Sequence, residues 1–273
     1  MECCSSVSVD EISNPSCLHP RPSLYNHPFM EPSRIAVLLA PFLDNASALS
    51  PTQLEQISTY IDLLVRWNSR VNLTAIRTPE QIVTRHFGES LFAARRLFPQ
   101  GSAAWPKASV PANAARSDAG RTEVLQSTAA FDETAAPVQL VDLGSGAGFP
   151  GLPIKIWSPP ATVSLIESNH KKVAFLREVI RALRLTYINV LSIRAEDVPA
   201  GSARTVIVRA VEHLHQILPT ALRLLVPKGR LALLIGSSQL EAAKRASMNV
   251  SWSSPEPLPN SRETVLLIGH RKE

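Results

Sequence analysis

The sequence predicts an α/β protein built on a doubly wound parallel sheet, with a small helical appendage on its N-terminal side. After residue 138, strand-like and helix-like apolar patterns alternate regularly, and a glycine-rich loop follows the first strand. Ahead of this stretch, residues 34–98 carry two amphipathic helix patterns. A length of 273 residues with 45% hydrophobic content is enough for one full core and such an appendage.

Both helices of the appendage begin with the same kind of signal. Ser50 is a helix N-cap residue followed by proline, and Gln53 completes a capping box. Apolar side chains then recur at helical spacing, at Leu54, Ile57, Ile61, Leu64 and Val65. Thr78 opens a second segment of this kind, with apolar positions at Ile82, Val83, Phe87, Leu91 and Leu97. We therefore predict two amphipathic helices ahead of the core.

Two further segments, residues 1–33 and residues 99–137, show no lasting apolar period. The first is rich in Ser, Pro, Asn and His, which predicts a disordered leader. The second is rich in Ala, Ser and Pro, and its length predicts a flexible insertion between the appendage and the core, residues 138–273.

The leader contains all three cysteines, Cys3, Cys4 and Cys17, which disfavours both a disulfide scaffold and a zinc site. It lacks the basic region and the apolar stretch of an export signal. The apolar run at 35–43 is too short to span a membrane and is interrupted by Pro41. We therefore expect a cytoplasmic protein that has no metal and no membrane contact.

Within the core, short apolar runs alternate with amphipathic segments. We predict strands at 138–143, 162–167, 187–193, 205–209 and 230–235. The intervening helices are expected near 150–157, 169–183 and 212–225. A short helix near 240–246, a proline-rich turn and a strand at 264–269 close the chain. Because the last two strands have no full crossover helix between them, they predict an antiparallel hairpin at the edge of the sheet.

The glycine-rich loop after the first core strand is the strongest functional signal. Asp142 lies at the end of the strand, and glycines follow at Gly144, Gly146, Gly148 and Gly151. Glycine permits positive φ angles and lets a ligand touch the backbone. An acid ahead of such a loop suits a ligand with an ammonium or sulfonium group, so we predict a site for S-adenosylmethionine. The alternatives are a nicotinamide or flavin site, since the loop satisfies G-x-G-x-x-G, and a tight turn without a ligand.

Three other strand ends of the core carry candidate site residues. Glu167 ends the second strand, where a carboxylate can accept hydrogen bonds from two ribose hydroxyls; the alternative is an exposed charge. Ala195 and Glu196 follow the third strand, where an adenine would lie, and the alternative is a solvated acidic turn. Arg209 ends the fourth strand. It contacts either the donor or a target phosphate, or it forms a salt bridge to Glu196 or Glu212.

Basic residues are grouped, although the net charge of +5 is moderate. One group lies in the helix at 169–183 and just beyond it: Lys171, Lys172, Arg177, Arg181 and Arg184. The other lies in the appendage: Arg66, Arg70, Arg77, Arg85, Arg95 and Arg96. They indicate either a track for a polyanion or ordinary solvated helix faces.

Several ordered motifs resemble the RsmG (GidB) family of bacterial small-subunit ribosomal RNA guanine-N7 methyltransferases. The resemblance covers roughly residues 50–98 and 138–270. The most specific motif is Val141-Asp142-Leu143-Gly144-Ser145-Gly146-Ala147-Gly148-Phe149-Pro150-Gly151. The others are Trp67-Asn68, Asn72-Leu73-Thr74, Arg85-His86, Glu89-Ser90, Glu167-Ser168, Lys172-Val173, Phe175-Leu176, Ala195-Glu196 and Arg209-Ala210.

The resemblance implies a seven-stranded class I methyltransferase (Rossmann-like) sheet, S-adenosylmethionine as cofactor, and 16S ribosomal RNA or the small ribosomal subunit as partner. We expect the protein to be a monomer. It implies that Gly144, Phe149, Ala195, Glu196 and Arg209 line the donor site. With the residues identified above, the expected donor site also includes Asp142, Gly146, Gly148 and Glu167. Arg209 is the expected catalytic residue, and Arg85, His86, Lys171 and Lys172 are expected to meet the RNA.

The residue types agree with methylation at N7. Guanine N7 is a lone pair without a proton, so the reaction needs no general base. After the fourth strand, Arg209-Ala210-Val211-Glu212 replaces the Asn/Asp-Pro-Pro-aromatic loop of amino-methylating enzymes, and the core has no cysteine for C5 methylation. Methylation of a ribose 2′-hydroxyl remains an alternative.

Two positions depart from the family pattern. Ile235 stands where the family usually has lysine, which removes a cation near the target, and Gly88 replaces a bulkier residue. Both departures call substrate binding into question more than donor binding. The remaining alternatives are a donor-binding but catalytically impaired RNA-binding protein and a nicotinamide-dependent oxidoreductase.

Overall fold

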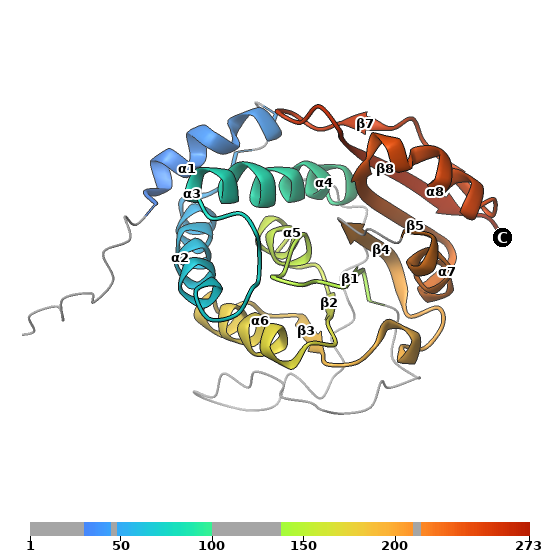
Figure 1. Ribbon diagram of the computed structural model, residues 1–273, viewed down its shortest axis with the longest axis horizontal. Helices are drawn as coiled ribbons and strands as arrows, with labels where there is room; N and C mark the ends of the chain where they lie inside the picture. The colour runs from blue at the N-terminus through green and yellow to red at the C-terminus, as the bar shows by residue number, and fades with distance from the viewer. Residues whose placement is uncertain (1–29, 45–47, 100–137, 210–213) are drawn as a thin grey trace, which may run out of the picture.

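The computed structural model describes residues 30–44, 48–99, 138–209 and 214–273, and its centre is one sheet (Figure 1). Along the sheet the order is β3-β2-β1-β4-β5-β8-β6, and β7 pairs with β8. The strands are β1 (Leu140–Leu143), β2 (Val163–Ile166), β3 (Ile188–Leu191), β4 (Ala203–Arg209), β5 (Leu225–Gly236), β6 (Val250–Trp252), β7 (Glu256–Pro257) and β8 (Thr264–Arg271).

The strand pairing confirms the predicted doubly wound sheet, although the described residues form eight strands and not the seven that the resemblance implies. Strands β1 to β5 are parallel neighbours, and the order reverses between β1 and β4. Strand β8 runs antiparallel to β5, as expected, but it is not the edge strand. The three-residue strand β6 covers its outer side, and Val250-Ser251-Trp252 is too short a pattern to be found from sequence.

Helices cover both faces of the sheet. Those of the core are α5 (Gly151–Trp157), α6 (His170–Ala182), α7 (Leu214–Leu224) and α8 (Leu240–Ala246). Short 3₁₀ turns lie at η4 (Ala195–Asp197) and η5 (Ser237–Gln239). Helix α6 starts where the sequence predicts, because the Asn169 side chain accepts hydrogen bonds from the backbone N–H groups of Lys171 and Lys172.

The N-terminal helices are α1 (Pro32–Leu39) with the turn η1 (Ala40–Phe42), α2 (Pro51–Asn68), α3 (Pro79–Gln81), the π-helical turn η2 (Ile82–Gly88) and α4 (Glu89–Leu97). The capping box of Ser50 and Gln53 is present, with Ser50 Oγ accepting from Gln53 N at 3.3 Å. Helix α1 begins within the segment expected as leader, and the Met30 carbonyl accepts a hydrogen bond from Ser58 Oγ at 2.6 Å. The rest of that leader and the expected insertion from residue 100 onward lie outside the described residues.

The N-terminal helices share one apolar cluster with one face of the sheet. The cluster joins side chains of α1, α2, η2 and α4 to those of α5 and α6, and it includes Leu140, Ile207 and Leu234 from the strands. A second cluster fills the opposite face beneath α7 and α8. In Figure 1 the N-terminal helices accordingly lie close to α5 and α6, with α7 and α8 on the other side of the sheet.

Gly88 is explained by this packing. A Cβ atom at Gly88 would lie 2.6 to 2.8 Å from ring atoms of Phe42, so the aromatic ring occupies the space that a larger residue would need. The departure from the family pattern at Gly88 is therefore compensated within the apolar cluster.

Among the described residues, no helix has the length and apolar content needed to cross a membrane. The same residues contain no group of three or more His, Cys, Asp or Glu side chains that could hold a metal ion.

Candidate functional site

The glycine-rich loop joins β1 to α5 and is held by the end of β2. The N–H groups of Gly144 and Ser145 both donate to the Ile166 carbonyl, each at 3.0 Å. Glu167 Oε2 accepts from Gly146 N at 2.9 Å, and Glu167 Oε1 accepts from Asn169 N at 2.8 Å. The Glu167 carboxylate thus ties the loop to the start of α6. Each oxygen keeps acceptor capacity for a further partner.

The glycines of the loop serve two different purposes. Gly144, Gly146 and Gly148 all have positive φ angles, of 73°, 58° and 89°. At Gly144 a Cβ atom would meet no atom within 4 Å, whereas at Gly148 it would lie 2.4 Å from Leu152 Cδ1 and 2.5 Å from Tyr60 Oη. Gly148 is therefore required by packing. Gly144 borders open space at the point where the strand order reverses, which is where open α/β sheets bind ligands.

Asp142 lies beneath the loop and does not face this space. It is 1% exposed, and its Oδ2 accepts from Gly151 N at 2.9 Å. Burial raises the pKa of Asp142 to about 7, against the lowering effect of the hydrogen bond from Gly151. The expectation that Asp142 meets the cation of a ligand is corrected, because its carboxyl group fastens the loop to the start of α5.

Aromatic side chains of the N-terminal helices pack directly on the loop. Phe149 stacks on Tyr60 with ring centroids 5.3 Å apart and on His86 with centroids 4.6 Å apart. The Tyr60 hydroxyl also donates a hydrogen bond to the Ala147 carbonyl. The N-terminal helices therefore help to set the conformation of the glycine loop. The Phe149 ring itself is only 7% exposed and is held between protein rings.

The turn η4 follows β3 and contains Ala195 and Glu196. Ala195 is half-buried and Glu196 is exposed. Arg223 Nη2 donates to the carbonyl oxygens of both residues at 3.0 Å, which fixes the backbone of the turn. The Glu196 side chain has no ion pair to Arg209, so this partner predicted for Arg209 is corrected. The other, Glu212, lies outside the described residues.

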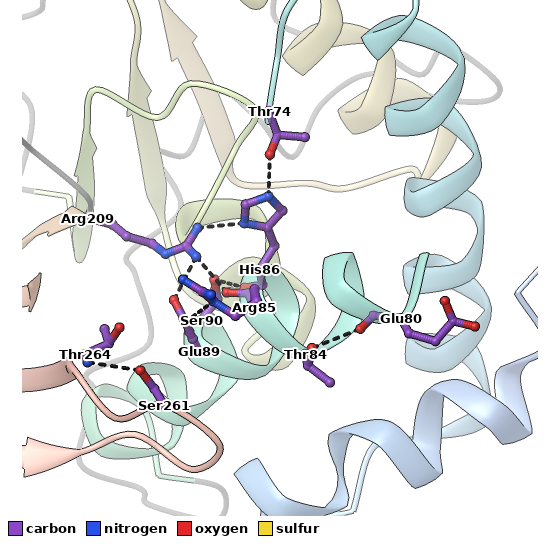
Figure 2. A network of polar contacts seen from close by, with 10 residues as sticks. All are labelled: Thr74, Glu80, Thr84, Arg85, His86, Glu89, Ser90, Arg209, Ser261 and Thr264. Carbon is purple, nitrogen blue, oxygen red and sulfur yellow. Dashed lines mark hydrogen bonds and ion pairs between the residues drawn. The ribbon is translucent and has the colours of Figure 1, made fainter. Parts of the chain in front are cut away.

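Arg209 instead reaches across to the N-terminal helices (Figure 2). Its Nη2 donates to Glu89 Oε2 at 2.8 Å and to the Arg85 carbonyl at 2.6 Å, and its Nη1 donates to His86 Nδ1 at 3.0 Å. Glu89 Oε1 accepts from Arg85 Nε at 3.1 Å, and His86 Nε2 lies 2.8 Å from Thr74 Oγ1. We call these five residues, Thr74, Arg85, His86, Glu89 and Arg209, the Arg209 network.

Comparison with known proteins decides the family. The family model described as GidB, rRNA small subunit methyltransferase G, matches residues 53–102 and 121–261. The chain belongs to this family. It is 35% identical over 236 residues to the Ribosomal RNA small subunit methyltransferase G of Chloroflexus aggregans, covering 81% of this chain and 82% of that protein. It is 30% identical over 242 residues to the protein of the same name from Streptococcus pyogenes serotype M5, covering 84% and 88%.

Solved structures with a similar fold are more distant. TYW2 of M. jannaschii, solved with AdoMet, has a TM-score of 0.41 at 19% identity, covering 50% of this chain and 68% of that one. TYW2 of P. horikoshii, solved with MeSAdo, has a TM-score of 0.43 at 19% identity, covering 50% and 58%.

Membership of the rRNA small subunit methyltransferase G family confirms the predicted methyltransferase class and S-adenosylmethionine as its cofactor. The described residues fit this donor. Gly144 borders open space with a φ of 73°, and the Glu167 carboxylate lies at the end of the adjacent strand β2.

Of the four residues expected to meet RNA, three lie at or near the surface. The Arg85 side chain is 58% exposed, Lys171 is exposed and Lys172 is half-buried. His86 is 9% exposed and both of its ring nitrogens have protein partners, so the expectation of RNA contact is corrected for this residue. The expectation for His86 rests on the Arg85-His86 motif, but two adjacent helix positions do not face the same direction.

The structure adds two residues that the sequence did not single out. Tyr60 is buried against the glycine loop, as described above. Lys155 in α5 is 1% exposed, and its Nζ donates to the carbonyl oxygens of Pro159 and Ala161 at 2.5 and 2.6 Å. Burial lowers the pKa of Lys155 to about 8. The partner of Tyr60, the Ala147 carbonyl, is brought near only by the fold. The partners of Lys155 are close in sequence, but no sequence motif marks a lysine that bonds to backbone carbonyls.

The protonation of His86 gives a testable pH dependence. Burial lowers the pKa of His86 from 6.5 to about 3, and the charges of Arg209 and Arg85 act in the same direction. A depressed folded-state pKa contributes stability that is present above pH 6.5 and is lost as the pH falls toward 3. Between pH 6.5 and 4 this loss amounts to roughly 3 kcal/mol. Urea unfolding at pH 7 and pH 4 should therefore show a smaller acid loss in His86→Gln than in the wild type.

The matched control is His270→Gln, at an exposed position on β8. This variant should keep the acid loss of the wild type. An equal acid loss in His86→Gln and the wild type would show that His86 is not held neutral.

Ile235 does not mark a lost cation at the surface. It is 2% exposed and packs in the second apolar cluster with Val208, Leu233 and Val265. We expect Ile235→Lys to lower the free energy of unfolding by about 3 kcal/mol or more, because an ammonium group would be buried without a partner. The control is Met248→Lys, at a position that is 82% exposed, which should change stability little. Unchanged stability with faster methyl transfer in Ile235→Lys would show that the lysine reaches the substrate.

Proposed function

We propose that this protein transfers a methyl group from S-adenosylmethionine to N7 of a guanine in 16S ribosomal RNA. The observation that carries the proposal is the loop at Gly144, which is open to a ligand and lies between the Glu167 carboxylate and the strand that ends in Arg209. Family membership supports a ribosomal RNA as the class of acceptor.

The residues of the donor site have distinct tasks in this proposal. Gly144 and Gly146 let the donor approach the backbone, and the free lone pairs of Glu167 accept its ribose hydroxyls. The backbone of Ala195 and Glu196, fixed by Arg223, borders the adenine. Asp142, Gly148 and Phe149 do not contact the donor in this proposal; they hold the glycine loop in its conformation. When bound, the donor supplies an electrophilic methyl group on its sulfonium.

The polar residues near Arg209 suit an acceptor that needs no base. His86 is neutral near pH 7, and its Nδ1 accepts from Arg209, which only donates. Its Nε2 therefore carries the proton and donates to Thr74 Oγ1. With both nitrogens engaged, His86 has no lone pair for a substrate proton. Guanine N7 has no proton to remove, so positioning of the reactants is the main requirement.

A basic surface beside the site is proposed to hold the RNA. Trp67 in α2 and Phe175 in α6 have ring centroids 5.7 Å apart, which brings the end of α2 beside α6. The exposed cations of α2, of the loop that follows α2 and of α6 are Arg66, Arg70, Arg77, Lys171, Arg177 and Arg181. Arg95 and Arg96 do not belong to this surface, because they form ion pairs with Asp44 at 3.2 Å and with Glu256 at 2.7 Å.

The proposal can be tested in cells by mapping N7-methylguanosine in 16S ribosomal RNA with and without the gene for this chain. We expect one modified guanine to disappear when the gene is deleted and to return when the gene is restored. An unchanged modification pattern would contradict the proposal. We further propose that the protein acts as a monomer in the cytoplasm, which size-exclusion chromatography and cell fractionation can check.

A further inference from the structure

The Arg209 guanidinium is oriented by three acceptors that lie on one turn of helix. They are the Arg85 carbonyl, His86 Nδ1 and Glu89 Oε2, at 2.6, 3.0 and 2.8 Å (Figure 2). Within the described part of the chain these contacts use three of the five N–H groups that a guanidinium offers. Three acceptors fix both the plane and the rotation of the group, and its two other N–H groups have no hydrogen bond to any residue that the structure describes.

We propose that Glu89 and His86 are positioning residues for Arg209, the group that we place against the substrates; this inference rests on the proposed function. Glu89 has a side chain that is 4% exposed, and its two oxygens bind Arg209 and Arg85. Two arginines around one carboxylate leave the network with a net positive charge. That charge suits the phosphate or the acceptor edge of an RNA base.

The shape of η2 is adapted to this task. The Glu89 N–H donates to the His86 carbonyl, and the Arg85 carbonyl accepts from Arg209 Nη2. A regular α-helix would pair the Arg85 carbonyl with the N–H of Glu89, four residues on. Here the Arg85 carbonyl accepts from a side chain of strand β4, and π-helical turns recur at functional sites.

His86 contributes orientation and no charge. Its ring is held between Thr74 on Nε2 and Arg209 on Nδ1, and its face stacks on Phe149 of the glycine loop. The same ring thus touches both the arginine of β4 and the loop of the donor site. A displaced His86 would therefore shift the two groups that have to be placed relative to each other.

A purely structural role, in which the network only docks the N-terminal helices, is a distinct alternative. A second ion pair, Arg96 to Glu256, also joins α4 to the C-terminal strands and lies outside the site. Glu256→Gln is therefore a matched control for docking. Glu89→Gln and Glu89→Asp test positioning, the second because it keeps the charge and withdraws it by one methylene group.

The experiment compares single-turnover methyl transfer to small-subunit RNA in a double-mutant cycle of Glu89→Gln and Arg209→Gln, with melting temperature and S-adenosylhomocysteine affinity measured on the same preparations. We expect Glu89→Gln to slow transfer ~10- to 100-fold per folded molecule, since small misplacements of a reacting group have effects of this size. In the Arg209→Gln background the same change should add almost nothing. Glu89→Asp should be slow as well, and Glu256→Gln should transfer at the wild-type rate.

A second readout needs no methyl transfer. In ¹⁵N NMR spectra at pH 6, His86 should be the neutral Nε2–H tautomer, and its pKa should rise in Arg209→Gln because a nearby positive charge is gone. Three results would each overturn the inference. They are additive effects of the two substitutions in the cycle, methyl transfer by Glu256→Gln that is as slow as that of Glu89→Gln, and a His86 pKa that is the same in Arg209→Gln as in the wild type. A wild type that binds S-adenosylhomocysteine but methylates no RNA would instead overturn the proposed function, and this inference with it.

Discussion

Gly144→Ala is expected to weaken binding of S-adenosylhomocysteine at least ~100-fold, because a methyl group would project into the space where a ligand meets the backbone. The protein itself should remain folded. A Cβ atom at Gly144 would touch nothing within 4 Å, so the only cost to stability is the positive φ of 73°. This conformational cost is about 1 to 3 kcal/mol for a residue with a side chain. Isothermal titration calorimetry measures the affinity, and urea unfolding measures the stability.

Gly201→Ala is the matched control for this substitution. Gly201 has a φ of 67°, and a Cβ atom there would also meet nothing within 4 Å. This residue, however, lies before β4, at the amino-terminal ends of the parallel strands, whereas Gly144 lies at their carboxyl ends. Both variants should lose similar stability, and only Gly144→Ala should lose ligand binding. Wild-type affinity in Gly144→Ala would mean that the donor does not bind along this loop.

Gly148→Ala should have the largest effect on stability. Its Cβ atom would lie 2.4 Å from Leu152 Cδ1, 2.5 Å from Tyr60 Oη and 3.0 Å from Leu176 Cδ2, with a φ of 89°. Strain and overpacking together cost about 2 to 6 kcal/mol, which is a large share of the stability of an ordinary domain. Chemical denaturation of both proteins gives this difference directly.

Adding Tyr60→Phe to the Gly148→Ala variant provides an internal check. It removes the hydroxyl oxygen that the new methyl group would strike, so the double variant should regain part of the stability lost in Gly148→Ala. If Gly148→Ala unfolds like the wild type, the glycine loop is not packed against α2 as described.

The regular parts of the fold could be predicted because their causes are local. The capping box at Ser50, the N-cap at Asn169 and the buried runs of β1, β2 and β4 each depend on residues close in sequence. The π-helical turn η2 was not predicted, and one of its contacts, the hydrogen bond from Arg209 to the Arg85 carbonyl, joins residues 124 positions apart. Strand β6 escaped detection because three residues do not establish a period.

The candidate site shows the same division. Sequence spacing correctly placed Glu167 and the glycines at the carboxyl ends of neighbouring parallel strands, since these ends lie side by side. It did not separate Gly144, which borders open space, from Gly148, which is packed against Tyr60. It also assigned Asp142 and His86 to ligands, although both are buried and bonded to the protein. Burial of a polar residue depends on distant segments, so a motif alone does not show whether the side chain faces a ligand.

Methyl transfer to guanine N7 of 16S ribosomal RNA can be measured with purified protein. Small ribosomal subunits or their RNA, taken from cells that lack the gene, are incubated with methyl-labelled S-adenosylmethionine and either the wild type or Gly144→Ala. We predict that the label is recovered as 7-methylguanine with the wild type and is absent with the variant. Recovery of the label on another base or on ribose, or no transfer by a wild type that binds S-adenosylhomocysteine, would contradict this prediction.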